Sequence, residues 1–351
     1  MTTTQSDPSL RATVLTAPAT FSTTPAVPPR PASGDVLVRV AETGLCGSDV
    51  TMYLGRHPVN RPPLTLGHEF HGELLSAGEG TRARPGDAVA VFPALSCGRC
   101  VSCLRGATNL CPDMGIVGAQ RPGALAGVVT VPAASVLPID PATPPGLRVL
   151  IEPLAVALHA VSRAGPVAGQ RCAVLGAGAI GTLVALVLRQ RGAKAVHRVD
   201  TDAHKLSLVG TGTAHHGDGR PLAELLGGEY GELDVVFDCV GSAALADQAL
   251  GAVRPGGTVV LVGVQHGALA LDGVGLQRGE RAVVGVQLYV LADFTESMRL
   301  LAHEPLFSGL PESLIRRNAV SDVAEVFDRL ARGASTHLKE TIVFTAKENP
   351  C

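Results

Sequence analysis

Residues 171–190 read RCAVLGAGAIGTLVALVLRQ, and this stretch decides the fold. An apolar strand is predicted over 171–175 and an apolar helix over 179–190, with the glycine motif GAGAIG at 176–181 between them. A G-x-G-x-x-G in this position lets the backbone turn tightly and approach a pyrophosphate at the helix N-terminus. The alternative is a glycine-rich structural turn. The cofactor-binding residues that the motif predicts are Gly176, Gly178, Ile180 and Gly181.

The segment after the motif bears on the choice of cofactor. A second strand is predicted over 195–199, and Asp200 ends it about 20 residues beyond the motif, where a carboxylate accepts hydrogen bonds from a ribose diol. A negative charge there repels the extra phosphate of NADP, so the sequence predicts NAD. The alternative for Asp200 is a solvated strand end. Lys205 is also predicted to bind the cofactor, and with Arg198 it could soften the preference for NAD.

The pattern of the chain changes near residue 150. Beyond it strands alternate with helices, which predicts an α/β fold with a doubly wound parallel sheet, covered on both faces. The further strands of this series are predicted at 233–239, 257–262 and 282–286.

Residues 1–150 are instead rich in Pro and Gly and are typical of a mainly β domain with long loops. Its clearest strands are predicted at 35–40, 87–92 and 127–131. The end of the chain is expected to return to this domain, through helices at 293–303 and 322–332 and a strand at 340–344.

Composition excludes several classes of protein. The 351 residues suffice for two domains, and 46% hydrophobic against 17% charged residues indicates a packed globular protein. With a net charge of -2 and no Lys/Arg cluster, neither nucleic acid nor a membrane is expected as a partner. Residues 1–8 do not resemble a secretion signal, and the apolar run 173–188 is shorter than the ~20 residues of a membrane span. We therefore expect a cytoplasmic protein.

Four of the eight cysteines lie close together in the pattern C-x2-C-x2-C-x7-C. Four thiolates at this spacing close a tetrahedral shell around zinc, so a structural zinc lobe is expected at about 95–113. An iron–sulfur cluster also takes four thiolates, but the flanking pattern is not that of a ferredoxin. The predicted structural ligands are Cys97, Cys100, Cys103 and Cys111. Cys172, Cys239 and Cys351 are expected to be core or tail residues without a catalytic role.

A second set of potential metal ligands is dispersed along the chain. It consists of Cys46 in GLCGSD, His68 and Glu69 in GHE, and Glu152 in IEPLA. Each residue alone has an ordinary explanation, as a small buried thiol, a core histidine or a helix cap. Together they match the way a catalytic zinc ion is held, by three protein ligands with one position open for water or substrate.

The order of these motifs resembles the zinc-containing medium-chain dehydrogenases over nearly the whole chain. Further matching stretches are PGD at 85–87, DCVG at 238–241 and RPGG at 254–257. The resemblance implies a mainly β GroES-like catalytic domain, formed by 1–150 with 293–351, and a NAD-binding Rossmann domain at 151–292. It also implies a homodimer or homotetramer, in which the strand at 282–286 could pair across subunits.

The resemblance also assigns the residues of the metal site. Cys46 and His68 should bind a catalytic Zn2+, and Glu152 stands where the classic alcohol dehydrogenases of the family have a cysteine ligand. The polyol and threonine dehydrogenases resemble this chain more closely, with a glutamate there and a ligating glutamate in the GHE motif. Glu69 is therefore the expected third ligand, with Glu152 binding directly or through water. Asp49 is expected to orient His68 by a hydrogen bond.

The proton path is expected to begin at Ser48, which would accept the proton of the alcohol. An ordinary loop serine is the alternative. Many family members carry a histidine five residues after the first cysteine ligand, where this chain has Thr51, so His57 or water is left to pass the proton on. The stretch 123–131 lacks the aromatic and acidic residues often found there, and the substrate pocket should differ accordingly.

These features predict a zinc-dependent oxidoreductase that transfers hydride between NAD and a secondary alcohol of a polyol, cyclitol or amino-alcohol, or the corresponding ketone. A zinc-free quinone or enoyl reductase of the same fold is disfavoured because both sets of metal ligands are present. A non-catalytic dinucleotide-binding protein is disfavoured because it has no need of an open metal site.

Overall fold

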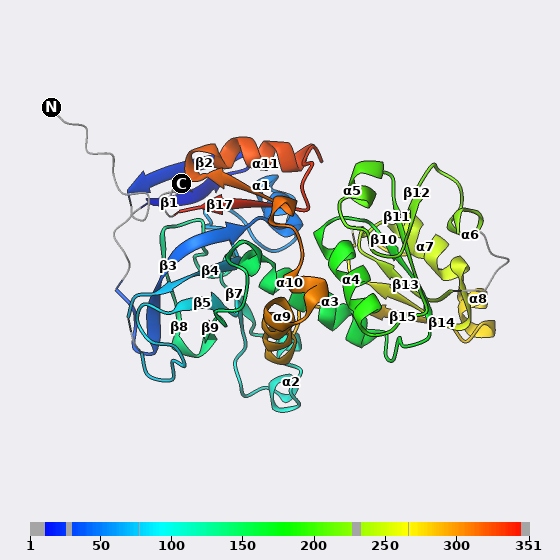
Figure 1. The fold of residues 1–351 in the computed structure, drawn as a ribbon, viewed down its shortest axis with the longest axis horizontal. Helices are drawn as coiled ribbons and strands as arrows, with labels where there is room; N and C mark the ends of the chain where they lie inside the picture. The colour runs from blue at the N-terminus through cyan, green and yellow to red at the C-terminus, as the bar shows by residue number, and fades with distance from the viewer. Residues whose placement is uncertain (1–10, 26–29, 77, 227–232, 266, 345–351) are drawn as a thin grey trace. The chain divides into compact units, whose positions relative to one another are not determined.

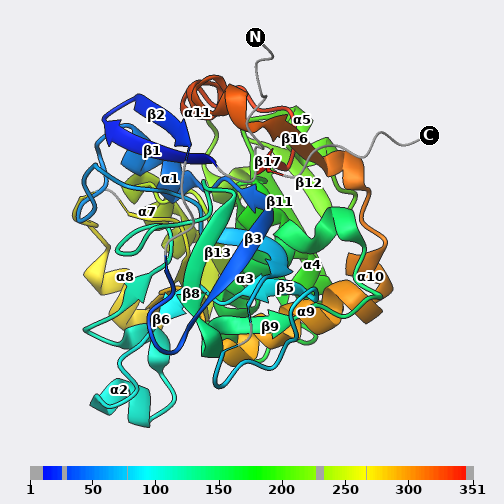
Figure 2. The ribbon, with the colours of Figure 1, turned by 90° about the vertical axis from the view of Figure 1, so that its left-hand side faces the viewer.

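The computed structural model describes residues 11–25, 30–76, 78–226, 233–265 and 267–344. The chain forms two compact units (Figures 1 and 2). One comprises Met1–Glu152 with Phe294–Cys351 and is called the β-rich unit below, and the other, Pro153–Asp293, is called the α/β unit. Each unit is described by itself.

The α/β unit is built on a six-stranded parallel sheet. Its strands lie in the spatial order β12 (Thr213–His216), β11 (Ala195–Asp200), β10 (Arg171–Leu175), β13 (Leu233–Asp238), β14 (Val253–Leu261), β15 (Ala282–Gly285). The chain adds two strands on one side of β10 and then three on the other, which is the order of a doubly wound dinucleotide-binding sheet. The predicted α/β architecture is confirmed.

Strand β10 and helix α4 (Ala179–Gln190) have the bounds that the sequence predicted. Strand β10 and helix α4 are apolar because α4 packs on β10 and β11 (Figure 1). Helix α7 (Ala243–Ala252) packs on β13 and β14. The apolar run 173–188 is therefore a strand followed by a helix, as expected. The other helices here are α3 (Ile151–Arg163), α5 (Ala203–Ser207), α6 (Leu222–Leu225) and α8 (Gly273–Arg278).

The β-rich unit contains a seven-stranded sheet. Its order is β16 (Ile315–Ala319), β17 (Lys339–Val343), β3 (Asp35–Gly44), β4 (Glu69–Leu74), β5 (Ala88–Val91), β9 (Val136–Pro138), with β8 (Val128–Pro132) also paired to β3. Strand β17 pairs antiparallel with β3, which confirms that the end of the chain returns to the first domain.

Smaller elements complete the β-rich unit. Two strand pairs are formed by β1 (Arg11–Ala17) with β2 (Thr20–Pro25), and by β6 (Ala94–Leu95) with β7 (Gly115–Ile116). The helices are α1 (Gly47–Tyr53), α2 (Val101–Leu104), α9 (Leu291–His303), α10 (Pro305–Ser308) and α11 (Val323–Ala331).

The two faces of the β3–β4–β5 sheet differ in polarity. Val36, Val38 and Val40 of β3 are fully buried in the hydrophobic core of the unit. Side chains alternate between the faces of a strand, so Arg39 of β3 and Glu73 of β4 point to the opposite face. This polar face carries the residues discussed below.

Among the described residues, one helical stretch is long and apolar enough to span a membrane by length and composition, Pro145–Arg163. It is 72% buried within the protein, as is usual for a core helix.

Candidate active site

Cys46 lies at the turn between β3 and α1, where it is the N-cap of the helix. Its backbone N–H donates to Oδ2 of Asp49 at 3.0 Å, so the first turn of α1 is closed by its own acidic side chain. Asp49 is fully buried, and its Oδ1 lies 3.4 Å from Nδ1 of His68. One carboxylate therefore holds both the Cys46 backbone and the His68 ring.

His68 directly precedes β4, and Asp49 decides which of its ring nitrogens is available. With Nδ1 facing Asp49, Nε2 is left for a metal ion. Burial lowers the pKa of His68, but the carboxylate of Asp49 and the thiol of Cys46 outweigh it, and the pKa is raised well above the usual value. A metal ion bound here would displace a proton from a site that already favours a cation.

Glu69, the first residue of β4, is 1% exposed and forms an ion pair with Lys339 of β17, which is 5% exposed. Burial lowers the pKa of Lys339, but Glu69 and then Cys46 raise it more, so the lysine remains a buried cation. Gly44 makes room for the pair, because a Cβ there would collide with Oε2 of Glu69. Lys339 was not identified from the sequence.

The fold brings Cys46, His68 and Glu69 together, with one ligand atom of each within 4.8 Å of the others. Sulfur, imidazole nitrogen and carboxylate oxygen are the donors that zinc takes, and three protein ligands leave a position open. The residues fit a catalytic zinc ion. Glu152, in the first turn of α3, is not in this group, although it is buried and near enough to Lys339 to raise its pKa.

The four clustered cysteines form a second candidate metal site, with all four sulfur atoms within 4.8 Å of one another and no disulfide among them. Sγ of Cys103 lies 3.5 Å from Sγ of Cys100 and 4.0 Å from Sγ of Cys97. A tetrahedral zinc ion with Zn–S bonds of about 2.3 Å requires sulfur atoms about 3.8 Å apart. The cluster therefore fits one metal ion in a closed shell.

Backbone N–H groups of this lobe donate to the sulfur atoms. The N–H of Cys97 donates to Sγ of Cys111 at 3.3 Å, and that of Cys103 donates to Sγ of Cys100 at 3.5 Å. The backbone of Arg99 and Cys100 lowers the pKa of Cys97 to about 6. The pKa of Cys103 is lowered as well, whereas that of Cys111 is raised to about 11, so Cys97 is the thiol of this lobe most readily converted to the thiolate that binds a metal.

The other described cysteines have a different environment. Burial raises the pKa of Cys172, in β10, to about 12, and burial also raises the pKa of Cys239 strongly. Both are therefore thiols at neutral pH, as expected of core residues. Cys351 lies outside the described residues.

The glycine motif has the geometry of a pyrophosphate loop. Gly176 has a φ of +94°, which favours glycine, and a Cβ on Gly181 would overlap the carbonyl group of Gly176. Gly178 is the N-cap of α4, and no atom lies within 4 Å of the place where its Cβ would be. Ile180 follows in the first turn. Space in front of the helix N-terminus and close contact behind it are what a dinucleotide requires.

Asp200 ends β11 beside this motif. Its Oδ2 accepts the N–H of Ala177 at 2.7 Å, and its Oδ1 accepts the N–H of Asp202 at 2.8 Å. The carboxylate is therefore held at the glycine loop. Lys205 lies on α5 and is partly exposed. Arg198, in contrast, is 2% exposed and donates to the carbonyl of Leu206 at 3.1 Å, so its charge is turned into the unit.

The proposed proton path includes three residues near Cys46. Ser48 is the second residue of α1 and is partly exposed. The hydroxyl of Thr51 donates to the carbonyl of Gly47 at 2.9 Å and is thus used within α1. His57 accepts two backbone N–H groups of its own loop at Nδ1, and burial lowers its pKa. That His57 or water passes the proton on stays a prediction.

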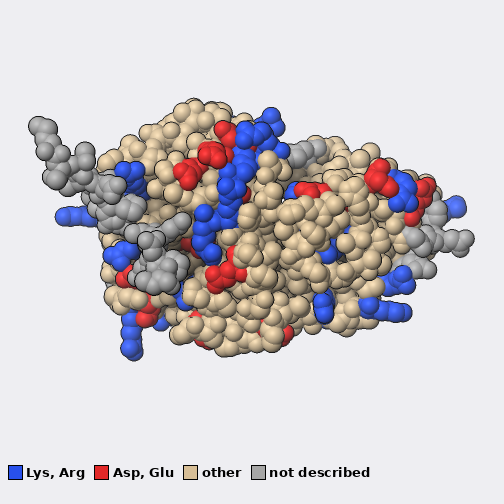
Figure 3. Space-filling model, turned by 45° about the horizontal axis from the view of Figure 1, so that its top comes forward, with Lys and Arg blue, Asp and Glu red and all other residues tan. Residues whose placement is uncertain are grey.

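Surface charge is mixed on the face shown in Figure 3, where a band of basic side chains has acidic side chains on both sides. The net charge of -2 is consistent with this. That neither nucleic acid nor a membrane is a partner stays a prediction.

Comparison with known proteins gives a consistent result. Residues 32–141 match the alcohol dehydrogenase GroES-like domain, and residues 179–303 match the zinc-binding dehydrogenases. L-galactonate-5-dehydrogenase of Escherichia coli K12 is 30% identical over 325 residues, which cover 90% of this chain and 94% of that protein. D-altritol 5-dehydrogenase of Agrobacterium fabrum is 35% identical over 239 residues, 66% of this chain and 69% of that protein. The structure of a zinc-binding dehydrogenase from Sinorhizobium meliloti bound to NADP has a TM-score of 0.86 and 30% identity, covering 95% of this chain and 98% of that chain.

Proposed function

Because this chain belongs to the zinc-type medium-chain dehydrogenase family, we propose that it transfers hydride between NAD and a secondary alcohol of a polyol, cyclitol or amino-alcohol. Its relatives named above are dehydrogenases of a sugar acid and of a polyol, and the chain is a dehydrogenase of this kind. The substrate is a polyhydroxylated small molecule or the corresponding ketone.

The observation that carries the proposal is the group formed by Cys46, His68 and Glu69 within 4.8 Å. A zinc ion, when bound there, supplies Lewis acidity to the substrate oxygen. Asp49 fixes the His68 ring so that Nε2 faces the ligand position. Ser48, two residues after Cys46, would accept the proton of the alcohol, and a nicotinamide cofactor would supply the acceptor of the hydride.

Glu69 is the third ligand in this proposal, and Glu152 acts from farther away, through water or through Lys339. Support comes from the distances, since Glu69 shares the 4.8 Å group and Glu152 does not. Glu152 is nonetheless close enough to affect the charge of Lys339.

NAD is the proposed cofactor because the carboxylate of Asp200 is held at the glycine loop, where it accepts hydrogen bonds from a ribose diol and repels a phosphate. The Sinorhizobium meliloti structure was bound to NADP, so the preference of this chain rests on its own residues. Arg198 is buried, whereas Lys205, on α5, is partly exposed.

Assembly and location complete the proposal. We place the protein in the cytoplasm, where the reducing environment keeps its cysteines as thiols. A homodimer or homotetramer is proposed, with β15 at the edge of the six-stranded sheet as the strand that pairs across subunits.

Metal analysis of the purified protein tests the site directly. The wild type should contain two zinc ions per chain, Glu69→Gln and Cys46→Ser should each retain one, and the matched variant Glu152→Gln should retain both. A wild type without zinc would favour the zinc-free reductase instead. Loss of zinc from Glu152→Gln with retention in Glu69→Gln would reverse the assignment of the third ligand.

A further inference from the structure

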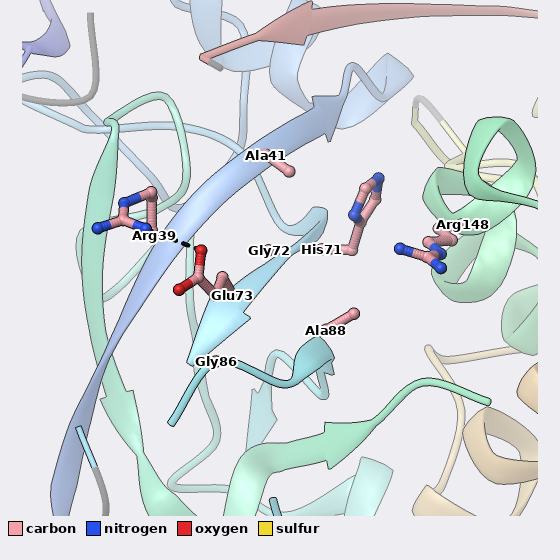
Figure 4. A pocket seen from close by; sticks show the side chains of 8 residues that line it. All are labelled: Arg39, Ala41, His71, Gly72, Glu73, Gly86, Ala88 and Arg148. Atoms are coloured by element: carbon pink, nitrogen blue, oxygen red, sulfur yellow. Dashed lines mark hydrogen bonds and ion pairs between the residues drawn. The ribbon is translucent and has the colours of Figure 1, made fainter. Parts of the chain in front are cut away.

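A pocket of about 270 Å³ lies on the polar face of the β-rich sheet. Its wall is formed by β3, β4 and β5 and by the short helix η4 (Pro145–Leu150). Four polar side chains line it: Arg39, His71, Glu73 and Arg148 (Figure 4). The pocket lies entirely within one unit, on the opposite side of the sheet from the hydrophobic core.

Small residues create the space. Two alanines and two glycines, Ala41, Ala88, Gly72 and Gly86, line the rest of the pocket. Gly72 cannot carry a side chain, because a Cβ there would overlap the carbonyl group of Arg39. The floor of the pocket is therefore backbone and methyl groups, and the charged groups stand around its edge.

The charges around the pocket do not balance. Nη1 of Arg39 lies 2.8 Å from Oε2 of Glu73, and this half-exposed pair neutralises itself. Arg148 extends from η4 toward His71 across the pocket (Figure 4). Its side chain has no hydrogen-bond or ion-pair partner among the described residues, and its Nε is buried. Burial lowers the pKa of Arg148.

The carboxylate that contacts His71 is already engaged. Oε1 of Glu42 accepts the hydroxyl of Thr341 at 2.6 Å and lies 3.3 Å from Nε of Arg317. Its Oε2 lies 3.6 Å from Nε2 of His71, a buried atom without a hydrogen bond. The pocket thus contains an uncompensated guanidinium and, opposite it, an imidazole ring whose Nε2 faces the carboxylate of Glu42.

We infer that this pocket binds a small oxyanion, a phosphate or a carboxylate group, with the guanidinium of Arg148 as its principal ligand. A guanidinium presents N–H groups in a planar fork that matches two oxygens of such a group. The volume is just below the range of about 300–1,000 Å³ typical of drug-sized ligands, so the ligand has few heavy atoms. Glu73 and Glu42 would repel the bound anion only weakly, because the negative charge of each is offset by a paired arginine.

The site is distinct from the candidate metal group, although β4 connects them. Glu69, His71 and Glu73 alternate along β4 and point to the same face, and His71 lies about 7 Å from Glu69 at the rise of a strand. A bound anion would therefore contact His71 and not Glu69, the proposed metal ligand. The inference does not depend on the proposed catalytic function.

The test is a titration of the zinc-loaded protein with inorganic phosphate and, separately, with acetate, by calorimetry at constant ionic strength. Saturating NADH is present throughout, so that phosphate cannot occupy the glycine loop. We expect saturable binding in the millimolar range or tighter. Arg148→Met should weaken it at least tenfold, whereas Arg121→Met, which removes an exposed arginine of the same unit, should leave it unchanged. If only phosphate binds, the ligand of the pocket carries a phosphate group. If acetate binds as well, the pocket also accepts carboxylates.

NADH binding shows whether each variant is folded. A second variant tests the pocket without removing Arg148. Ala88→Glu places a tethered carboxylate in the pocket, so its thermal midpoint should rise and its response to phosphate should disappear. Equal binding by the wild type and Arg148→Met, no binding by the wild type, or an unchanged phosphate response in Ala88→Glu would overturn the inference.

Discussion

The Glu69 carboxylate has two candidate counter-ions, the buried ammonium of Lys339 and a metal ion held with Cys46 and His68. A carboxylate has two oxygens, so it can serve both at once. Without a cation beside it, a carboxylate that is 1% exposed would be costly to ionise. Lys339 therefore supplies a buried cation beside Glu69 at the metal position, and this makes it a positioning residue.

Replacing Lys339 with methionine should destabilise the metal-free protein by about 3 kcal/mol, because a buried carboxylate loses its partner. Zinc should restore part of that loss, which urea unfolding with and without the metal would measure. The double variant Glu69→Gln with Lys339→Met serves as control, since it removes both charges of the pair, and it should be more stable than Lys339→Met alone. Equal stability of Lys339→Met and the wild type without metal would contradict this role.

Asp200 determines the cofactor preference in this account. Asp200→Asn removes the charge and keeps the shape, so kcat/KM with NAD should fall roughly 10- to 100-fold, the equivalent of about 1.5–3 kcal/mol for a hydrogen bond to a charged group. The ratio of kcat/KM for NADP to that for NAD should rise. Asp202→Asn is the matched control, because Asp202 caps α5 and its loss should affect stability without changing the ratio. An unchanged ratio in Asp200→Asn would show that the carboxylate does not select the cofactor.

At the scale of elements, Glu42 connects the strands of the β-rich sheet. It lies on β3 and contacts Thr341 of β17, Arg317 of β16 and His71 of β4. Burial raises the pKa of Glu42, but its neighbours, His71 first, outweigh this and the pKa is lowered. The charged form is thus the one that holds these strands together.

The pH dependence of stability follows from that direction. A carboxylate with a lowered pKa contributes stability that is fully present above the unfolded value, about 4.3, and is lost as pH falls through the folded value. Glu42→Gln should therefore destabilise the protein by about 2 kcal/mol at pH 7, with the difference shrinking below about pH 4.3. Glu73→Gln, at a half-exposed pair, should cost less than about 1 kcal/mol. Denaturant unfolding across this pH range checks both, and a pH-independent difference for Glu42→Gln would refute the assignment.

Elements with a regular apolar pattern could be predicted, and others could not. Strand β10 and helix α4 were placed to the residue because their side chains are buried on all sides around a short glycine motif. Strand β4 reads EFHGEL and was missed, since its polar positions carry ionisable residues that the fold buries beside a metal group. Strand β12 reads TAHH and lacks any apolar alternation. Where function or an edge position replaces hydrophobic patterning, the usual strand signal disappears.

The same contrast holds for the candidate site. Cys46 with Asp49, and His68 with Glu69, are neighbours in sequence and could be identified from local motifs. Lys339 could not, because a lysine is usually a surface residue and its partner lies in a distant segment of the chain. Pairing of β17 with β3 brings it to the site, and only the folded sheet reveals that.

At the scale of the whole molecule, the two units divide the chemistry. The β-rich unit contains both candidate metal groups, and the α/β unit contains the glycine loop with Asp200. The chain leaves the first unit near Glu152 and returns to it at Phe294, so neither unit is a separable appendage of the other. Metal binding and cofactor binding can therefore be disturbed independently, while hydride transfer needs both.

The most direct test of the central claim is NADH formation by the purified protein with polyols, cyclitols, amino-alcohols and simple alcohols, assayed with NAD and with NADP before and after chelation. We predict turnover with a polyhydroxylated secondary alcohol, faster with NAD, that is abolished by removal of the catalytic zinc and restored by its return. Turnover that is indifferent to chelation, or a protein that turns over none of these substrates and binds no metal, would contradict the account.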